Sequence, residues 1–397
     1  MRISTAGFHR STLEALNNRQ ADLAKTQGQI ASGLRVNTPA DDPSAAVHIL
    51  QLQRALAQSE QFGRNANTAT NRLSLEEQSL ADATSILQRV RDLTVQGNSA
   101  SLSDSDRAAL ATEIDQQFNA LMDLANQKDA AGEYLFAGTA TQTQPFSTSN
   151  SSVSYAGDAN VRLIQTSATQ KIPDGHSGFD VFMDIKEANG TFTATLGNAN
   201  TGSGSVQRTA LTNPAAWTPD TYTITFTSAT AYQVTNAANT VVTTGTFATG
   251  DTVSFNGAQV TLDGVPATGD TFTVAPATTQ DVFATVNNLR NTLRSTTTTP
   301  AQKAQLVSSL GATLTQLDNS LAHIGDVRSE VGARLNSIDD TQANREDAKV
   351  TLESTLSDLK DLDYAEAVSR LTLQQTGLQA AQASYARLSQ LSLFDYL

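Results

Sequence analysis

The side chains best suited to catalysis or metal binding are sparse in this chain and do not cluster. Its four histidines lie far apart, and no two stand three or four residues apart: His9, His48, His176 and His323. A metal site or an acid–base pair needs such residues on one face of an element. We therefore expect the histidines to be solvated or partly packed, without a metal or catalytic role.

Several aspartates stand where they could bind a cation or share a proton. Asp251, Asp263 and Asp270 lie near glycines in expected β-turns, where calcium ligands can occur, but the ligand spacing of an EF-hand is missing. Aspartates are common in turns because their side chains bond to the local backbone. Asp41 and Asp42 are adjacent and precede a proline, so we expect their carboxylates to point apart and to cap a helix.

Other patterns of catalytic and cofactor-binding residues are also missing. The chain has no cysteine, which excludes disulfides, thiol nucleophiles and zinc–thiolate sites. The motifs GxxxxGKS/T, GxSxG and HExxH do not occur in it. The Gly-Ser repeat at residues 202–205 is not followed by a helix that could receive a phosphate. The sequence therefore predicts no catalytic residue, no cofactor, no metal site and no enzyme.

Composition narrows the class of protein further. The formal net charge is −13 and no run of five basic residues exists, which argues against binding to a phosphate backbone. Only 39% of the residues are hydrophobic and 16% are charged, which suits thin helical layers and exposed β-surface. We find neither a secretory h-region nor an apolar run of about 18 residues. We expect a protein that is cytoplasmic, or exported without a cleaved Sec signal.

Long helices are predicted at both ends of the chain, and they must position any residues that contact a partner. Residues 44–144 and 301–397 contain no proline, and their apolar residues recur at alternating steps of three and four, the period of a coiled coil. We expect a first helix that ends near Gly33, a second over residues 43–96, and a third that is capped at residues 103–106 and ends at Gly132.

The middle of the chain has a different composition and a different hydrophobic pattern. From residue 138 to residue 299 it is rich in Thr and Gly, and period-two strands are predicted at Thr221–Phe226, Thr252–Phe255 and 258–262. An Asn-Gly pair at residues 256–257 joins the last two, which is a strong hairpin signal. Helix resumes near Asp281, and two further helices complete the chain after a break at residues 296–300.

The two end helices each carry one narrow apolar seam. The seam residues that we expect to form an assembly interface are Leu13, Leu16, Leu23, Ile30, Leu34, Tyr364, Leu371, Leu378, Tyr385 and Leu388. A lone terminal helix with so few large seam residues is marginal in water. Our hypothesis is that both ends are largely disordered in the monomer and fold against neighbouring subunits. The alternative is an ordinary coiled coil between the two ends of one chain.

Both helical ends resemble the bacterial flagellins and their relatives. The residues that carry the resemblance are IASGLRVN at 30–37, ADD at 40–42, RNAN at 64–67, LQRVRDL at 87–93, SDSD at 103–106 and DLDYAEAV at 361–368. The central β-block matches nothing useful, as expected for a part that varies in the family. Three segments resemble the hook–filament junction group more than filament flagellins: MRIST at 1–5, GEYLFAGT at 132–139 with QPF at 144–146, and LSLFDYL at 391–397.

The resemblance implies an α+β fold: an antiparallel helical coiled coil or bundle from both chain ends, which forms a rod, with an inserted, mostly β domain. We expect a terminal coiled coil from residues 1–44 and 357–397. A helical rod domain with a β-hairpin region is expected from residues 45–183 and 277–356, and a variable β domain over residues 184–276.

The resemblance further implies a structural role in the flagellum outside the cell. The protein is expected to form a ring of identical subunits between hook-associated protein 1 and the flagellin filament, after export through the flagellar type III apparatus. An export chaperone is expected to bind the C-terminal helix at Leu371, Leu378, Tyr385, Leu388 and Leu391. Neither nucleic acid nor a membrane is an expected partner.

Two other readings of the sequence remain open. The chain could be a filament-forming flagellin. Alternatively, the central block could make it an adhesin or an enzyme, for which only the turn aspartates and Trp217 speak.

Overall fold

The computed structural model describes the backbone of residues 5–149 and 152–390, and their side chains except those of residues 5, 6, 8 and 388–390. Its helices are α1 (Thr5–Ser32), α2 (Pro43–Gly97), α3 (Asp104–Ala125), α4 (Val282–Leu293), α5 (Pro300–Lys360) and α6 (Tyr364–Gln390). None of the helices in this described part is long and apolar enough to cross a membrane.

The helices begin at the residues that the sequence marks as caps. The backbone N–H of Ala45 donates to Asp42 Oδ1 at 2.9 Å, which caps α2 as expected. At α3, Ser103 and Asp106 form a reciprocal capping box. The side chain of Asp281 accepts from the backbone N–H of Ala284 and caps α4.

The expectation that the third helix continues to Gly132 is wrong. Helix α3 ends at Ala125, because the side chain of Asn126 bonds to the backbone of another segment. Its amide donates to the Phe146 carbonyl and accepts from the Phe146 N–H, each at 3.0 Å. Gly132 instead lies in the following turn, with a φ of +80°.

The chain divides into two compact units. Unit 1 consists of residues 1–64 and 340–397, and unit 2 of residues 65–339. Each is described separately below. The three-part division that we expect from the sequence stays a prediction.

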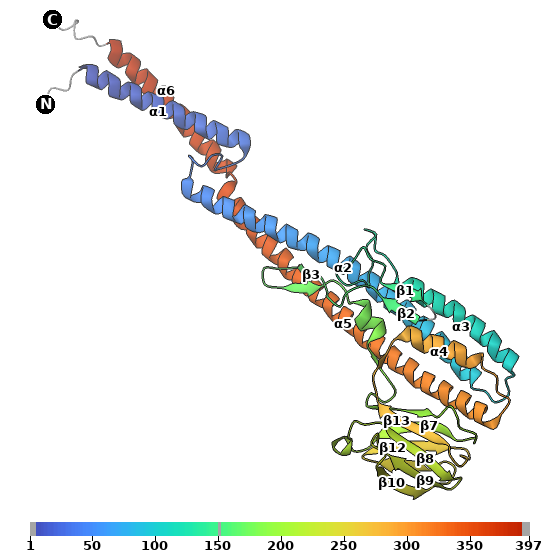
Figure 1. The fold of residues 1–397 in the computed structure, drawn as a ribbon. Helices are drawn as coiled ribbons and strands as arrows, with labels where there is room; N and C mark the ends of the chain where they lie inside the picture. Colours follow the sequence, from blue (N-terminus) through green and yellow to red (C-terminus); the bar gives the residue numbers. More distant parts are fainter. Residues whose placement is uncertain (1–4, 150–151, 391–397) are drawn as a thin grey trace. The chain divides into compact units, whose positions relative to one another are not determined.

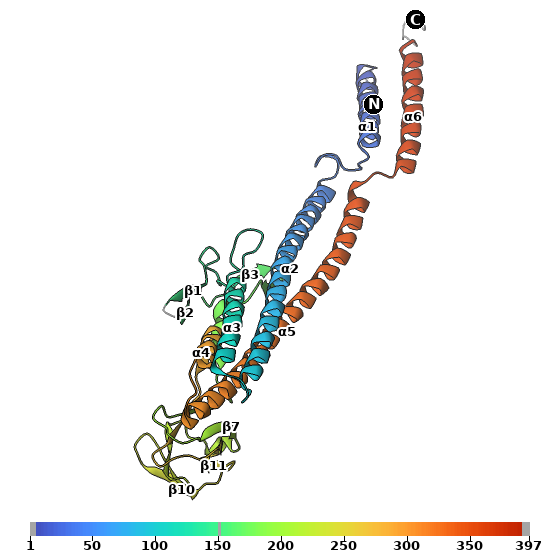
Figure 2. The same ribbon diagram turned by 90° about the vertical axis from the view of Figure 1, so that its right-hand side faces the viewer.

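Unit 2 contains a helical part built around α3, α4 and the segments of α2 and α5 that belong to it (Figures 1 and 2). Leucines from α2 and α5, including Leu80, Leu87, Leu310 and Leu317, are fully buried in its core. This core also contains a cluster of phenylalanines in mutual contact: Phe136, Phe146, Phe182 and Phe283.

Short strands and a helical turn lie against this helical core. They are β1 (Phe146–Ser149), β2 (Ser152–Tyr155), β3 (Leu163–Gln165), β4 (Lys171–Pro173), β5 (Ile185–Lys186), β14 (Thr279–Gln280) and the π-helical turn η1 (Phe179–Met183). Within the described residues they form three antiparallel pairs: β1 with β2, β3 with β4, and β5 with β14.

The rest of unit 2 is an antiparallel β part with its own core. Its elements are β6 (Phe192–Leu196), β7 (Ser205–Leu211), η2 (Pro214–Ala216), β8 (Tyr222–Ser228), β9 (Ala231–Thr235), β10 (Val241–Thr246), β11 (Thr252–Phe255), β12 (Ala258–Asp263) and β13 (Thr271–Pro276). One sheet has the order β10-β9-β8-β13-β6 and the other β11-β12-β7. Alternate residues, such as Phe226, Phe272, Val260 and Leu262, face the core between them.

The fold class predicted from the sequence is confirmed: helical ends flank a central antiparallel β part. The predicted hairpin is also present, since β11 and β12 pair through Phe255 and Ala258 around the Asn-Gly turn. Asn256 and Gly257 have φ values of 44° and 78°, the left-handed conformation that such a two-residue turn requires.

Candidate assembly interface

The two end helices of unit 1 pack against each other in antiparallel orientation. His9 near the start of α1 lies edge-on to Tyr385 near the end of α6, with ring centroids 5.8 Å apart. At the other end of the pair, Leu34 forms an isolated antiparallel β-bridge with Asp361. The sequence-predicted seams of the two helices are therefore brought together within one chain.

The predicted interface residues are only partly covered by this pairing. Those that are half-buried are Leu16, Leu23, Ile30, Leu34, Leu371, Leu378 and Tyr385. Leu13 is 47% exposed and Tyr364 is 54% exposed. The side chain of Leu388, and Leu391 altogether, lie outside the described residues, as do the segments 1–4 and 391–397 that carry part of the family resemblance.

No large apolar side chain is buried within the described parts of α1 and α6. The buried residues of this pair are Thr26 and Gln29 of α1 and Ala367 of α6. A pair of helices can cover only one stripe of each, whereas a helix in a bundle is covered from several sides. The geometry therefore leaves room for further helices around the pair.

The segments after α1 and before α6 are joined by backbone hydrogen bonds. The N–H of Arg35 donates to the Lys360 carbonyl at 2.7 Å, and the N–H of Leu362 donates to the Gly33 carbonyl at 3.0 Å. Gly33 has a φ of +73°, which ends α1 and turns the chain toward this bridge. The two sequence signatures that carry the family resemblance thus meet at this junction, which the sequence alone does not reveal.

Side chains reinforce the same junction. Arg35 Nη2 donates to the Leu359 carbonyl at 2.6 Å, and its Nη1 lies 3.5 Å from Asp42 Oδ2. The amide of Gln29 donates to the Arg35 carbonyl at 2.6 Å. Unit 1 also contains a small apolar cluster, which consists of Val36, Ala45, Ala46, Ile49, Leu356 and Leu359.

The adjacent carboxylates Asp41 and Asp42 bind different groups, as expected for capping residues. Asp41 accepts from the Thr38 N–H at 2.9 Å and pairs with Lys25 at 3.1 Å. The hydrogen bond from the Thr38 backbone and then the Lys25 ammonium lower the pKa of Asp41 to about 2. The Ala45 N–H lowers the pKa of Asp42. Both carboxylates are thus held ionised by structural contacts rather than paired for proton transfer.

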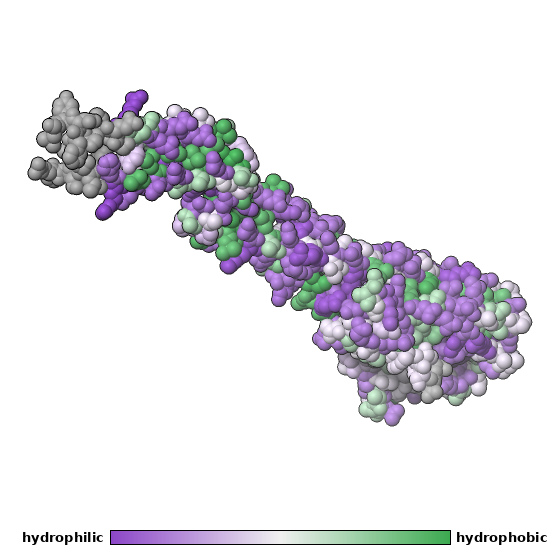
Figure 3. Space-filling model, turned by 90° about the horizontal axis from the view of Figure 1, so that it is seen from above, coloured by the Kyte–Doolittle hydropathy of each residue, from purple (hydrophilic) through white to green (hydrophobic). Residues whose placement is uncertain are grey.

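Unit 1 also exposes apolar residues that the seam analysis missed. Val368 is 51% exposed and Leu373 is 71% exposed on α6, while Val47, Leu50 and Val350 are exposed on α2 and α5. From Leu371 and Leu378, helical periodicity places Leu373 on roughly the opposite face of α6. Figure 3 shows hydrophobic residues at the surface of these helices. In the sequence, such exposed residues can be recognised as large apolar residues that lie outside the heptad seam.

The expectation that all four histidines are solvated or partly packed is wrong for His176. This residue is 8% exposed, and its Nδ1 and Nε2 lie 2.7 Å from Glu76 Oε1 and 2.8 Å from Glu330 Oε2. Both ring nitrogens can donate to carboxylates only when the imidazole is protonated. His176 therefore acts as a buried cation that ties its segment to α2 and α5, which the scattered positions of the histidines hide.

The turn aspartates of the β part are engaged by the backbone. Asp270 is 2% exposed and accepts hydrogen bonds from the N–H groups of Thr201, Gly202 and Ala267. Asp251 accepts from the Ala248 N–H at 2.8 Å. In the described part of the chain, no three His, Cys, Asp or Glu residues are grouped so that they could hold a metal ion.

Comparison with known protein families matches most of the chain in three parts. The model of the bacterial flagellin N-terminal helical region matches residues 3–141, and that of the bacterial flagellin C-terminal helical region matches residues 314–397. A third model, the D2-like domain of flagellar hook-associated protein 1, matches residues 196–276.

Individual proteins give a consistent result. Flagellar hook-associated protein 3 of Escherichia coli (strain K12) is 37% identical over 185 residues, which are 47% of this chain and 58% of that protein. The chain thus matches less than two thirds of the length of this curated relative.

Two crystal structures are similar over more of their length. That of Xanthomonas campestris FlgL has 35% identity and a TM-score of 0.74, and the alignment covers 77% of this chain and 99% of that one. That of flagellar hook associated protein-3 from Legionella pneumophila has 32% identity and a TM-score of 0.76, with 78% and 98% covered.

Proposed function

Because this chain belongs to the bacterial flagellin family, we propose that it is a structural subunit of the flagellum at the junction between hook and filament. It assembles as a ring between hook-associated protein 1 and the flagellin filament. The similarity to hook-associated protein 3, together with the family models that match both helical ends, supports this position. The relatives are structural flagellar proteins, and the proposed role needs no catalytic group.

One observation carries the assembly mechanism: the apolar residues of the α1–α6 pair stay half-covered or exposed in the single chain. Burying them against the same helices of neighbouring copies removes this apolar surface from water, which is the main favourable contribution to association. Because Leu373 lies away from α1, such a ring covers α6 from both sides.

Before assembly, the same apolar surface needs protection. We infer that the chain is exported through the flagellar type III apparatus and that an export chaperone first binds α6. The predicted contacts are Leu371, Leu378, Tyr385, Leu388 and Leu391, at helical spacing, which suits an amphipathic helix in a hydrophobic groove. Extracellular location in the flagellum follows from this route.

The decisive experiment adds the purified chain to short flagellin seeds and measures filament length and bound protein by electron microscopy with a labelled subunit. A junction subunit adds a limited layer, because its neighbours along the axis are different proteins. Unlimited growth from the seeds would instead identify a filament flagellin and overturn the junction role.

A matched pair of variants tests whether α6 is the interface. Leu373→Asp places a charge on the exposed apolar face and is expected to block addition without changing the stability of the monomer. Gln379→Asp, at an exposed polar position of the same helix that is turned away from both the seam and Leu373, is expected to add normally. Equal addition of both variants contradicts the proposed interface.

A further inference from the structure

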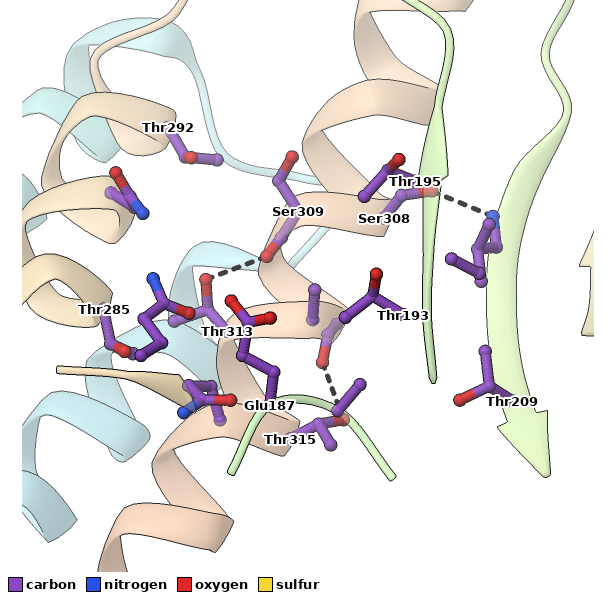
Figure 4. A pocket seen from close by; sticks show the side chains of 18 of the residues that line it. Glu187, Thr193, Thr195, Thr209, Thr285, Thr292, Ser308, Ser309, Thr313 and Thr315 are labelled. Carbon is purple, nitrogen blue, oxygen red and sulfur yellow. Dashed lines mark hydrogen bonds between the residues drawn. The ribbon is translucent and has the colours of Figure 1, made fainter. Parts of the chain in front are cut away.

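Unit 2 contains a cavity that the assembly role leaves unused. Its volume is about 480 Å³, and it is bounded by β6, β7, α4 and α5 (Figure 4). In this view Thr193 of β6 and Thr313 of α5 stand on either side of the space, with Glu187 between them. The volume is within the range of roughly 300–1,000 Å³ that is usual for ligand sites.

On the strand side, two strand edges rather than sheet faces line the cavity. It is lined by three consecutive residues of β6, Thr193–Thr195, and four consecutive residues of β7, Val206–Thr209. Side chains alternate between the two faces of a strand, so a surface that meets consecutive residues meets the edge. Strand β6 is the last strand of one sheet and β7 the last strand of the other.

The ladder of β6 determines which backbone groups face the cavity. The N–H of Gly197 donates to the Thr271 carbonyl and that of Ala277 donates to the Thr191 carbonyl, each at 2.9 Å. In an antiparallel ladder the bonded residues alternate, so every second residue of β6 bonds to β13. Ala194 belongs to the other set, and its N–H and C=O point away from β13, toward the cavity.

The edge of β7 is open in the same way. The Thr212 N–H donates to the Gly257 carbonyl at 2.9 Å, and by the same alternation Thr209 turns its N–H and C=O away from β12. One group on this edge already has a partner, because the Val206 N–H donates to Ser308 Oγ of α5 at 3.0 Å. Acceptors are therefore accommodated on this side of β7.

A buried donor on α5 lacks a partner at the same place. Gln316 lines the cavity and is 4% exposed, and its Nε2 has no hydrogen-bond partner among the described residues. Buried amide groups are nearly always hydrogen-bonded, because an unpaired donor loses its water without compensation. An acceptor on a molecule in the cavity satisfies this donor.

The lining determines the chemical class of that molecule. Fourteen of the 21 lining residues are Thr, Ser, Asn or Gln and none is aromatic, so a flat ring has no stacking surface. Only Glu187 and Arg208 are charged, and Glu187 already accepts from Thr278 Oγ1 at 2.8 Å. The cavity therefore suits an uncharged molecule with both donors and acceptors and without bulky groups.

We propose that this cavity binds a short extended peptide segment, uncharged and rich in Ser, Thr, Asn and Gly, that adds to the open edge of β6 and lies beside β7. A peptide backbone carries alternating donors and acceptors at the spacing of a strand edge. The lined lengths of β6 and β7 correspond to about four residues at roughly 3.3 Å per residue. The backbone groups of Ala194 pair with the segment, the β7 residues line its far side, and Gln316 donates to one of its carbonyls.

The test uses the full chain labelled with ¹⁵N and a pool of end-capped hexapeptides composed of Ser, Thr, Asn, Gly and Ala. Amide signals of residues 193–195 and 206–209 are expected to shift with saturation below about 1 mM peptide. The same peptides with alternate backbone nitrogens methylated are expected to bind at least tenfold more weakly. No shift at about 1 mM, or equal binding of the methylated peptides, overturns the proposal.

Two variants and a control locate the binding. Ala194→Pro removes the N–H that faces the cavity but no bond to β13, and is expected to weaken binding at least tenfold. The control Thr244→Pro is at β10, the opposite edge of the same sheet. The Phe247 N–H donates to the Thr230 carbonyl, so by the same alternation Gly245 and Thr243 bond to β9 and the N–H of Thr244 faces outward. This variant is expected to bind peptide normally. Equal effects of the two prolines contradict strand addition.

Gln316→Leu keeps the side-chain volume and removes the unpaired donor. It is expected to weaken peptide binding while leaving thermal stability equal or higher, which separates a binding role from a structural one. Glucose and N-acetylglucosamine serve as alternative ligands. If they shift the same amides and the peptides do not, the cavity is a carbohydrate site and the proposal fails.

Discussion

The guanidinium of Arg345 on α5 occupies the space that a side chain at Gly63 of α2 would fill. Arg345 Nη1 also lies 3.4 Å from the Ser59 carbonyl, one helical turn before Gly63. Glycine in the middle of a helix is unfavourable by roughly 0.5–1 kcal/mol relative to alanine. Its presence here is explained by the close approach of the arginine within unit 1.

This relationship predicts a coupled pair of variants. In an Arg345→Ala background, Gly63→Ala is expected to raise the free energy of unfolding by about 1 kcal/mol, because helix propensity improves and nothing is displaced. In the wild-type background the gain is expected to vanish, because the new methyl group displaces the guanidinium. Urea unfolding followed by circular dichroism measures both effects. Equal effects in the two backgrounds would show that the residues are not coupled.

A second prediction concerns the pH dependence of stability through His176. Glu76 of α2 and then Glu330 of α5 raise its pKa above 6.5 despite burial and the nearby Arg334, which act in the opposite direction. The folded state therefore holds this proton more tightly than the unfolded state. The resulting stability is complete below pH 6.5 and is lost as the pH rises through the raised pKa.

Urea midpoints measured from pH 6 to pH 9 are expected to fall more for the wild type than for His176→Gln, which cannot lose a proton. His48→Gln is a suitable control, because His48 is exposed on α2. Its midpoints are expected to follow those of the wild type. Identical pH profiles for the wild type and His176→Gln would contradict the assignment of His176 as a buried cation.

A third prediction compares two glycines near the end of α1. Gly33 has a φ of +73°, and a Cβ added there would lie 3.0 Å from the Tyr364 hydroxyl. Gly33→Ala is expected to lower the free energy of unfolding by about 1–3 kcal/mol, because alanine is strained in this left-handed conformation. Gly28 has open space around it, so Gly28→Ala is expected to stabilise α1 by roughly 0.5–1 kcal/mol.

Hydrogen exchange of the Arg35 and Leu362 amides reports directly on this junction, because both bond across it. Faster exchange is expected in Gly33→Ala and slower or unchanged exchange in Gly28→Ala. The critical result is which variant exchanges faster. Faster exchange in Gly28→Ala than in Gly33→Ala would disprove the proposed role of the left-handed turn at Gly33.

A fourth prediction concerns the end helices before assembly. The α1–α6 pair buries no large apolar side chain among its described residues, so we expect weak amide protection of residues 10–34 and 364–390 in the monomer. Protection is expected to rise sharply in assembled material. Strong protection in the monomer would favour the alternative, a stable coiled coil within one chain.

The sequence predicts those features that depend on local pattern. Helix starts at Asp42 and Ser103, the β11–β12 hairpin and the seams of α1 and α6 all follow from residues close together in the chain. The end of α3 was missed because Asn126 bonds to Phe146, which no local pattern reports. The same limit hides the buried His176, since Glu76 lies 100 residues away from it.

The candidate interface likewise has features that the sequence predicts and features that only the structure shows. Periodicity selects Leu23 and Leu371 as seam residues, but only the structure shows that they stay half-covered. It also brings the two signatures together, which spacing along the chain cannot do. Leu373 is not predicted as an interface residue, because a heptad seam marks one stripe per helix, whereas a helix surrounded by neighbours has several.

The hydrogen bond from Arg35 to the Leu359 carbonyl joins residues 324 positions apart, so most of the chain, though neither end helix, lies within the loop that it closes. Contacts of such long range form late, because the entropy of closing the loop must be lost before they contribute. A chain that is still being synthesised has no partner for the N-terminal signature until residues 359–362 have been added. The junction in unit 1 therefore forms only after almost all of the chain before α6 has been made, so the N-terminal signature stays without this partner during most of synthesis.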